Sequence, residues 1–293
     1  MDIGRYLKER REIVEKALDR LLPPEHSPPE KLHESMRYSV FAGGKRLRPI
    51  LCMAALEALG KDPLPFMPAA CALELVHTYS LIHDDLPAMD DDDLRRGKST
   101  NHKVFGEAVA ILAGDALLTL SFELIARMDA APAPVRLEIV KRLAQCSGTT
   151  GLVGGQVLDL ASEGREVSEE TLERIHAHKT AALIETAVVC GGILGGASEG
   201  QVCAVSMYGR SLGMAFQITD DILDAAGDEA KIGKRARKDR ESRKATYPGR
   251  YGIDGARRIA GEYIHKALGA LQPFDDKADT LREIARMIAS RER

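Results

Sequence analysis

Residues 69–85 have the pattern of a helix with an apolar body and one narrow polar stripe. A helix on a protein surface has the reverse pattern. The stripe follows three-and-four spacing and consists of Glu74, His77, Thr78, Asp84 and Asp85. His77 and Asp84 share one face about two turns apart, or ~10.5 Å along the axis. Such a helix is expected to be buried on most sides, with its stripe facing something polar in the interior.

Residues 214–227 repeat this pattern around four polar positions at i, i+3, i+4 and i+7, which are Gln217, Asp220, Asp221 and Asp224. Buried carboxylates without partners are very costly, so the pattern predicts a positive charge close to them. Ligands that are all oxygen suit magnesium or calcium rather than zinc. Magnesium commonly joins a few carboxylates to substrate phosphates. Two such clusters in one chain therefore favour a magnesium site.

Each acidic cluster also has an ordinary interpretation. Asp84 and Asp85, together with Asp90–Asp93, could form an acidic turn in solvent. The aspartates of residues 220–224 could pair with Arg or Lys from neighbouring helices. His77, taken alone, is more often a core histidine than a ligand.

The composition favours an all-α protein. Aromatic residues make up 4% of the chain and Trp is absent, whereas the helix formers Ala, Leu, Glu and Arg are plentiful. Hydrophobic residues make up 44%, which is enough for a core. Helix breakers are scattered along the chain rather than gathered in one linker. We therefore expect a single all-helical domain over residues 1–293.

Charge, cysteines and hydropathy argue against several classes of protein. The formal net charge of −3 creates no field that would attract nucleic acid or a membrane surface. Five cysteines without a CxxC pair indicate free thiols, so we expect a cytoplasmic protein. The charged N-terminus has no apolar signal region, and no run of 18 apolar residues predicts a membrane span.

Basic residues gather at three places, each of which could be an ordinary solvated segment. They are the GGKRLRP stretch at 43–49, the pair Arg95 and Arg96, and the segment 231–250 with nine basic residues. A nucleic-acid patch is disfavoured because stacking aromatics do not interleave the basic run. Acidic and basic clusters together fit diphosphate plus magnesium better.

These residues resemble the trans-prenyltransferase family, which includes the farnesyl and geranylgeranyl diphosphate synthases. The stretch DDLPAMD at 84–90 looks like the first aspartate-rich motif, DDxxxxD, and DDILD at 220–224 looks like the second, DDxxD. The supporting matches are GGKRLRP at 43–49, Arg95-Arg96-Gly97, GQVLDL at 155–160, Lys179-Thr180, Lys234 and KATYP at 244–248. The resemblance runs from about residue 35 to 250, and it departs from the family at Arg237, where a Gly is usual.

The resemblance implies the all-α isoprenoid synthase fold, with helices around a central cavity, and a homodimer. It implies Mg²⁺ held by Asp84, Asp90 and Asp220, with Asp85, Asp221 and Asp224 as further ligands or as groups that support the ligands. It assigns the allylic diphosphate to Arg95, Lys179, Lys234 and Lys244. It assigns isopentenyl diphosphate to Lys45, Arg48, His77 and Arg96. Thr180 and Gln217 would place oxygen dipoles near the reacting cation.

The implied reaction is head-to-tail condensation of isopentenyl diphosphate with dimethylallyl and geranyl diphosphate, giving farnesyl diphosphate. Tyr79, five residues before Asp84, is in the family the aromatic floor that stops the chain at fifteen carbons, and the small Ser80 adds nothing to it. A geranylgeranyl diphosphate synthase is the alternative, since Tyr79 could instead be an ordinary core residue. A class I terpene cyclase and a non-catalytic partner subunit are remoter alternatives, because both acidic motifs and the isopentenyl pocket are present.

Overall fold

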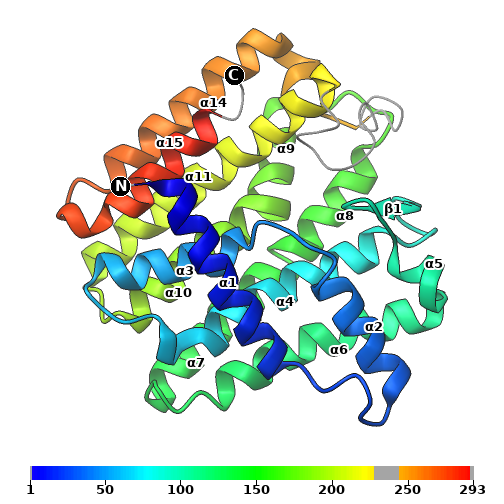
Figure 1. Cartoon of the computed structure of the whole chain (residues 1–293). Coiled ribbons are helices and arrows are strands. Elements are labelled where there is room, and N and C mark those ends of the chain that lie inside the picture. Colours follow the sequence, from blue (N-terminus) through cyan, green and yellow to red (C-terminus); the bar gives the residue numbers. More distant parts are fainter. Residues whose placement is uncertain (1, 228–243, 291–293) are drawn as a thin grey trace. The chain divides into compact units, whose positions relative to one another are not determined.

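The computed structural model describes residues 2–227 and 244–290, and it confirms the all-α prediction (Figure 1). The helices in the described part are α1 (Ile3–Leu21), α2 (Glu30–Val40), α3 (Leu47–Ala58), α4 (Met67–Asp84), α5 (Asn101–Phe105), α6 (Glu107–Ala126), α7 (Ala133–Ser147), α8 (Leu152–Ser162), α9 (Glu169–His176), α10 (Ala182–Leu194), α11 (Glu199–Ala226), α14 (Tyr247–Ala270) and α15 (Asp279–Ser290). Short 3₁₀ turns cover Leu64–Phe66 and Asp276–Ala278. Among the same residues, the one hairpin pairs β1 (Leu94–Arg95) with β2 (Lys98–Ser99).

The chain divides into two compact units, and the division falls within α3 and α7. The N-terminal unit contains residues 2–50 and 64–140, and the C-terminal unit contains 51–63 and the described part of 141–293. The first acidic motif belongs to the N-terminal unit and the second to the C-terminal unit. A single domain over residues 1–293, with both motifs facing one cavity, stays a prediction.

In the N-terminal unit, α4 lies in the interior and packs against α1, α2 and α6. Most of its side chains are buried, including Glu74, Thr78 and Tyr79. The sequence predicted a helix over 69–85 that is buried on most sides, and α4 matches it within two residues at each end. The apolar body of α4 thus has neighbours on nearly all faces, as expected for a helix with only one narrow polar stripe.

In the C-terminal unit, α11 packs along α10 and α14 (Figure 1). A capping box begins α11: Ser198 Oγ accepts from Gln201 N, and Gln201 Oε1 accepts from Ser198 N. Gly227, in the left-handed conformation, ends the helix three residues after Asp224, the last aspartate of the second acidic motif. Helices α9 and α10 are joined by a π-helical turn over Ala177–Ala181, which carries Lys179 and Thr180. Such turns shift side chains relative to a regular helix and are frequent at functional sites.

Two helical stretches, Glu107–Ala126 and Glu169–Leu194, are long and apolar enough to cross a membrane by length and composition. The most apolar window is 67% buried in the second stretch and 39% buried in the first. Helices that build a protein core have the same composition, so these two are weak support for a membrane span. The sequence prediction of no membrane span asked for a run of 18 uninterrupted apolar residues, which is a stricter criterion, and it stays a prediction.

Candidate active site

The first acidic motif closes the C-terminal end of α4. The backbone N–H of Asp90 donates to Asp84 O at 2.8 Å, and that of Asp92 donates to Asp85 O at 3.2 Å. These bonds satisfy carbonyls that the end of a helix leaves without partners. They also turn the chain back, so that Asp90 lies near the helix end beside Asp84. Both side chains are half-buried and reachable by solvent.

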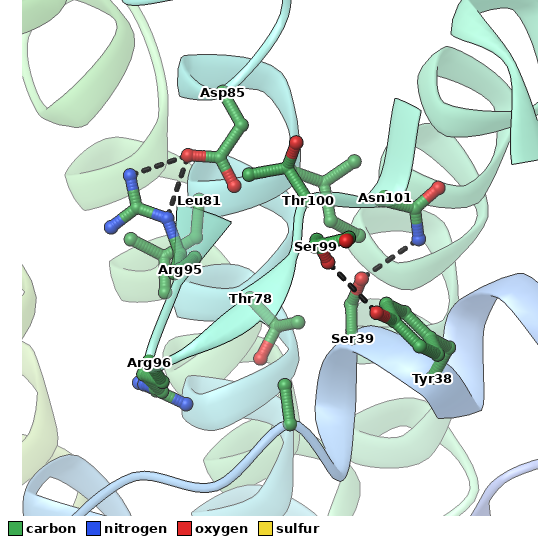
Figure 2. Close-up of a pocket in the computed structure, with 12 residues that line it drawn as sticks. Tyr38, Ser39, Thr78, Leu81, Asp85, Arg95, Arg96, Ser99, Thr100 and Asn101 are labelled. Carbon is green, nitrogen blue, oxygen red and sulfur yellow. Dashed lines mark hydrogen bonds and ion pairs between the residues drawn. The ribbon is translucent and has the colours of Figure 1, made fainter. Parts of the chain in front are cut away.

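Asp85 differs from its neighbour Asp84 because it is 3% exposed and bound to Arg95. Arg95 donates from Nε at 2.6 Å, and its Nη2 lies 2.5 Å from the same carboxylate oxygen (Figure 2). Burial raises the pKa of Asp85 above its ordinary value, and Arg95 opposes that rise. In this structure the Asp85 carboxylate thus binds the guanidinium of Arg95.

Asp85 and both arginines of the hairpin line a small pocket between α2, α4 and the hairpin (Figure 2). Around it, Tyr38 Oη donates to Ser99 O at 2.8 Å and Asn101 Nδ2 donates to Ser39 Oγ at 2.8 Å. These bonds fix β2 and the start of α5 against α2.

Arg96 occupies the two-residue turn of the hairpin and reaches the GGKRLRP loop. Arg96 and Gly97 both have positive φ (54° and 77°), as a type I′ turn requires. The Arg96 Nη1 donates to Gly43 O. At Gly44 (φ 124°) a Cβ would lie 2.5 Å from that guanidinium, so only glycine fits both the backbone and the contact. The two basic motifs are therefore one structural group.

Positive charges converge around His77 on α4. Burial and the charges of Arg48, Arg96 and Arg95 lower the pKa of His77 well below its ordinary value. Burial also lowers the pKa of Arg96, with a further contribution from Arg46 and Arg95 against the opposing charge of Glu74. Arg48, the second residue of α3, is half-buried, and Lys45 on the loop before α3 is exposed. A cluster of this sign favours an anion, and Arg forks suit phosphate oxygens.

Arg46 was not predicted as a site residue, yet it is the most buried charge of the cluster, at 1% exposure. Its Nη1 donates to Glu74 Oε1 at 2.8 Å and its Nε donates to Glu15 Oε1 at 2.9 Å. Its φ of 52° lies in the left-handed region, which is uncommon for a residue with a side chain. The two carboxylates thus hold the loop between Gly44 and Arg48 in an unusual conformation.

The second acidic motif also divides into reachable and buried carboxylates. Asp220 is half-buried, whereas Asp221 and Asp224 are each 3% exposed. Asp221 Oδ1 accepts from Gln217 Nε2 at 2.9 Å, and its Oδ2 accepts from Tyr247 N at 3.3 Å. His176 Nε2 lies 3.5 Å from Oδ2. Asp221 therefore links α11 to the ends of α9 and α14.

The π-helical turn brings Lys179 and Thr180 into this part of the C-terminal unit. Lys179 Nζ donates to Asp159 Oδ2 on α8 at 2.6 Å. Thr180 Oγ1 donates to Gln217 Oε1 at 2.7 Å. Hydrogen bonds thus join Thr180, Gln217 and Asp221, and Lys179 lies next to Thr180 in the chain. The structure adds Asp159 and His176 as their partners. Lys244 is described and half-buried, whereas Lys234 and Arg237 lie outside the described residues.

Among the described residues, no three His, Cys, Asp or Glu side chains are arranged to hold a metal ion by themselves. The donor chemistry nevertheless fits magnesium, which keeps several waters and takes only one or two carboxylates together with substrate phosphates. Of the six aspartates predicted to hold or support the metal, Asp84 and Asp90 in the N-terminal unit and Asp220 in the C-terminal unit are half-buried and reachable by solvent. A site of this kind would be completed by the substrate rather than by the protein alone.

Tyr79 is 4% exposed within α4. Its ring meets that of His83 edge-on at 5.7 Å, and His83 Nε2 lies 3.0 Å from Ile111 O on α6. Ser80 Oγ donates to His77 O at 2.9 Å. This position is compatible with a tunnel floor and equally with ordinary core packing, so the chain-length role stays a prediction.

Comparison with known proteins decides the family. The polyprenyl synthetase model matches residues 29–287. The chain belongs to the polyprenyl synthetase family. It is 46% identical to the farnesyl diphosphate synthase of Geobacillus stearothermophilus over 100% of this chain and 99% of that protein. It is 50% identical to a chloroplastic geranylgeranyl pyrophosphate synthase of Catharanthus roseus over 99% of this chain and 82% of that protein.

The fold agrees with this membership. The apo crystal structure of an FPP/GFPP synthase from Zymomonas mobilis matches with a TM-score of 0.89 at 37% identity, covering 98% of this chain and 99% of that one. The chain is thus a trans-prenyl synthase with the all-α isoprenoid synthase fold, and isoprenoid diphosphates are its substrate class. The family resemblance inferred from the motifs is confirmed.

The buried triad around Arg46 generates a stability prediction. Replacing Arg46 with Met leaves the Glu74 carboxylate, whose side chain is 2% exposed, without its partner. We expect a loss of about 3–5 kcal/mol in the free energy of unfolding, measured by urea denaturation. The matched control is Arg5→Met, which breaks an exposed Arg–Glu pair with side chains 78% and 54% exposed and should cost under ~1 kcal/mol. Equal effects of the two variants would show that the triad does not hold the loop.

Proposed function

We propose that the chain condenses isopentenyl diphosphate with dimethylallyl and geranyl diphosphate to give farnesyl diphosphate. The observation that carries this proposal is the division of charge on α4: His77 lies within a cluster of arginines, and Asp84 ends the same helix as a carboxylate that solvent reaches. One helix thereby offers an anion site without metal and a group that suits a metal-bound diphosphate.

The side chains divide the work between two diphosphates. Lys45, Arg48, His77 and Arg96 bind isopentenyl diphosphate. Arg95, Lys179 and Lys244 bind the allylic diphosphate, together with Lys234. Asp84, Asp90 and Asp220 would hold Mg²⁺, which would supply positive charge to the departing diphosphate. Thr180 and Gln217 stabilise the allylic cation, which the double bond of isopentenyl diphosphate attacks, and the released diphosphate takes the final proton.

The fifteen-carbon product is favoured by one side chain, Tyr79. A large aromatic residue buried one and a half turns before Asp84 would block a longer hydrocarbon tail. Relatives of similar identity include both farnesyl and geranylgeranyl diphosphate synthases, so geranylgeranyl diphosphate is the second candidate product.

We further propose a homodimer in the cytoplasm. Helix α6 is strongly apolar, and it leaves Ile111 and Leu112 exposed by 43% and 57%. A second copy of the chain is the proposed cover for this face; a monomer at micromolar concentration by light scattering would contradict it. All five cysteines are free thiols, which suits a reducing compartment.

The direct test incubates the purified chain with labelled isopentenyl diphosphate, each allylic starter and Mg²⁺, followed by separation of the dephosphorylated alcohols. We expect metal-dependent formation of farnesol. Cyclised products from an allylic diphosphate alone would indicate a cyclase. Activity that requires a second, different chain would indicate a partner subunit.

Replacing Asp84 or Asp220 with Ala should abolish condensation without unfolding the protein. Each change removes a carboxylate that binds the metal, and we expect kcat to fall at least ~100-fold. The melting temperature should be unchanged or slightly raised, because repulsion between neighbouring carboxylates is relieved. The control is Asp254→Ala, whose side chain is 98% exposed. Turnover near wild type at saturating Mg²⁺ would refute the metal role of the altered residue.

Arg48→Ala and Lys179→Ala should damage different substrates. The first should raise the KM for isopentenyl diphosphate roughly 10-fold or more, and the second that for the allylic diphosphate, since each loses a charge-assisted bond to one diphosphate. Steady-state kinetics with each substrate varied in turn provide the measurement. Equal changes in both KM values for either variant would show that the two-site assignment is wrong.

Replacing Tyr79 with Ala should open space below the first acidic motif and shift products toward twenty carbons or longer. His83→Ala is the matched control, because it removes the ring that Tyr79 packs against and leaves Tyr79 in place. The alcohols from both variants are compared with wild type. An unchanged profile for Tyr79→Ala, or geranylgeraniol as the main wild-type product, would remove the support for the farnesyl assignment.

A further inference from the structure

Asp221 and Asp220 are neighbours with the same chemistry but different surroundings. Both Asp221 carboxylate oxygens have partners within the protein: Gln217 on one oxygen, and Tyr247 N with His176 on the other. The side chain of Asp221 is 2% exposed, whereas Asp220 is half-buried. We infer that Asp221 is a positioning residue that sets the direction of the hydrogen bonds leading to Thr180, an inference that rests on the proposed function.

The direction follows from which groups can donate. A carboxylate only accepts hydrogen bonds, so the NH₂ group of Gln217 must face Asp221. The amide oxygen of Gln217 then faces Thr180 Oγ1, at 2.7 Å. Thr180 has one hydroxyl proton and must donate it to that oxygen. What remains on Thr180 Oγ1 is lone-pair density, which stabilises a positive charge. With the opposite direction, Thr180 would present a proton to the allylic cation.

The surroundings keep this relay in place. Tyr247 is the first residue of α14, and His176 is the last residue of α9 before the π-helical turn. Their rings pack at 5.1 Å between centroids. Tyr247, whose N–H binds Asp221, belongs to a buried hydrophobic cluster with Met214, Ile218 and Ile222 of α11. Hydrogen bonds in such surroundings are stronger than in water. Asp221 thereby connects α9, α11 and α14, and through Gln217 it sets the direction of the Thr180 hydroxyl proton.

One substitution should reverse the direction of the hydrogen bonds between position 221 and Thr180, and a second should restore it. In Asp221→Asn, the amide oxygen must accept from Tyr247 N, so the NH₂ group faces Gln217. Gln217 then turns over, and its own NH₂ group donates to Thr180. Adding Gln217→Glu restores an acceptor toward Thr180 and another toward Asn at position 221. The double variant keeps the total charge of the wild-type pair, while Gln217→Glu alone places two carboxylates together.

The experiment measures condensation for wild type, Asp221→Asn, Gln217→Glu and the double variant. We expect kcat to fall roughly 10- to 100-fold in each single variant, as for loss of one oriented dipole, and to recover at least tenfold from either single variant in the double variant. The control is Asp254→Asn on α14, which makes the same chemical change at a 98% exposed side chain. A double variant no more active than the worse single variant would overturn the relay.

Two further readouts separate positioning from metal binding and from the proposed function. The Mg²⁺-dependent binding event for inorganic diphosphate, measured by calorimetry, should be unchanged in Asp221→Asn and lost in Asp220→Asn; equal loss of that event in both would make Asp221 a ligand. The melting temperature of the double variant should exceed that of Gln217→Glu without any substrate. If wild type does not condense the substrates, the proposed function fails, while this melting comparison still tests the relay. A double variant that melts no higher than Gln217→Glu contradicts it.

Discussion

A charged side chain inside a protein must have a partner, and this constraint shapes the basic cluster and both acidic motifs. Arg46, at 1% exposure, lies between Glu74 and Glu15. Breaking such a pair leaves a buried charge at high cost, although the intact pair itself adds little net stability. The pair therefore acts mainly by fixing conformation: the bonds to Arg46 hold the loop that carries Lys45 and leads into Arg48 at the start of α3.

The same constraint separates residues that chemistry alone would treat as equal. In each acidic motif, one aspartate of the leading pair is half-buried and the other is almost fully buried with protein partners. Asp85 binds Arg95, and Asp221 binds Gln217 and Tyr247 N. Asp84 and Asp220 stay reachable by solvent. Each DD pair thus combines a carboxylate suited to metal and substrate with one that organises its surroundings.

Much of this was predictable from local pattern, and the remainder depends on distant contacts. The apolar body of 69–85 predicted α4 because burial on all sides needs that composition. The start of α11 at Glu199 also has a local signal, because the Ser198–Gln201 spacing is that of a capping box. The residues of the π-helical turn at 177–181 do not distinguish it from a regular helix, so the sequence did not predict it. The division between Asp84 and Asp85 depends on Arg95, which a hairpin brings back to the helix, so adjacent residues offered no clue.

The central claim is that the chain has two diphosphate sites, one built from cationic side chains and one that requires magnesium. Isothermal titration with inorganic diphosphate, with and without Mg²⁺, tests it most directly. The account predicts one binding event per chain without Mg²⁺, weakened by Arg48→Ala, and a second event with Mg²⁺ that Asp220→Ala removes. A single event that neither Mg²⁺ nor Asp220→Ala alters would contradict the account.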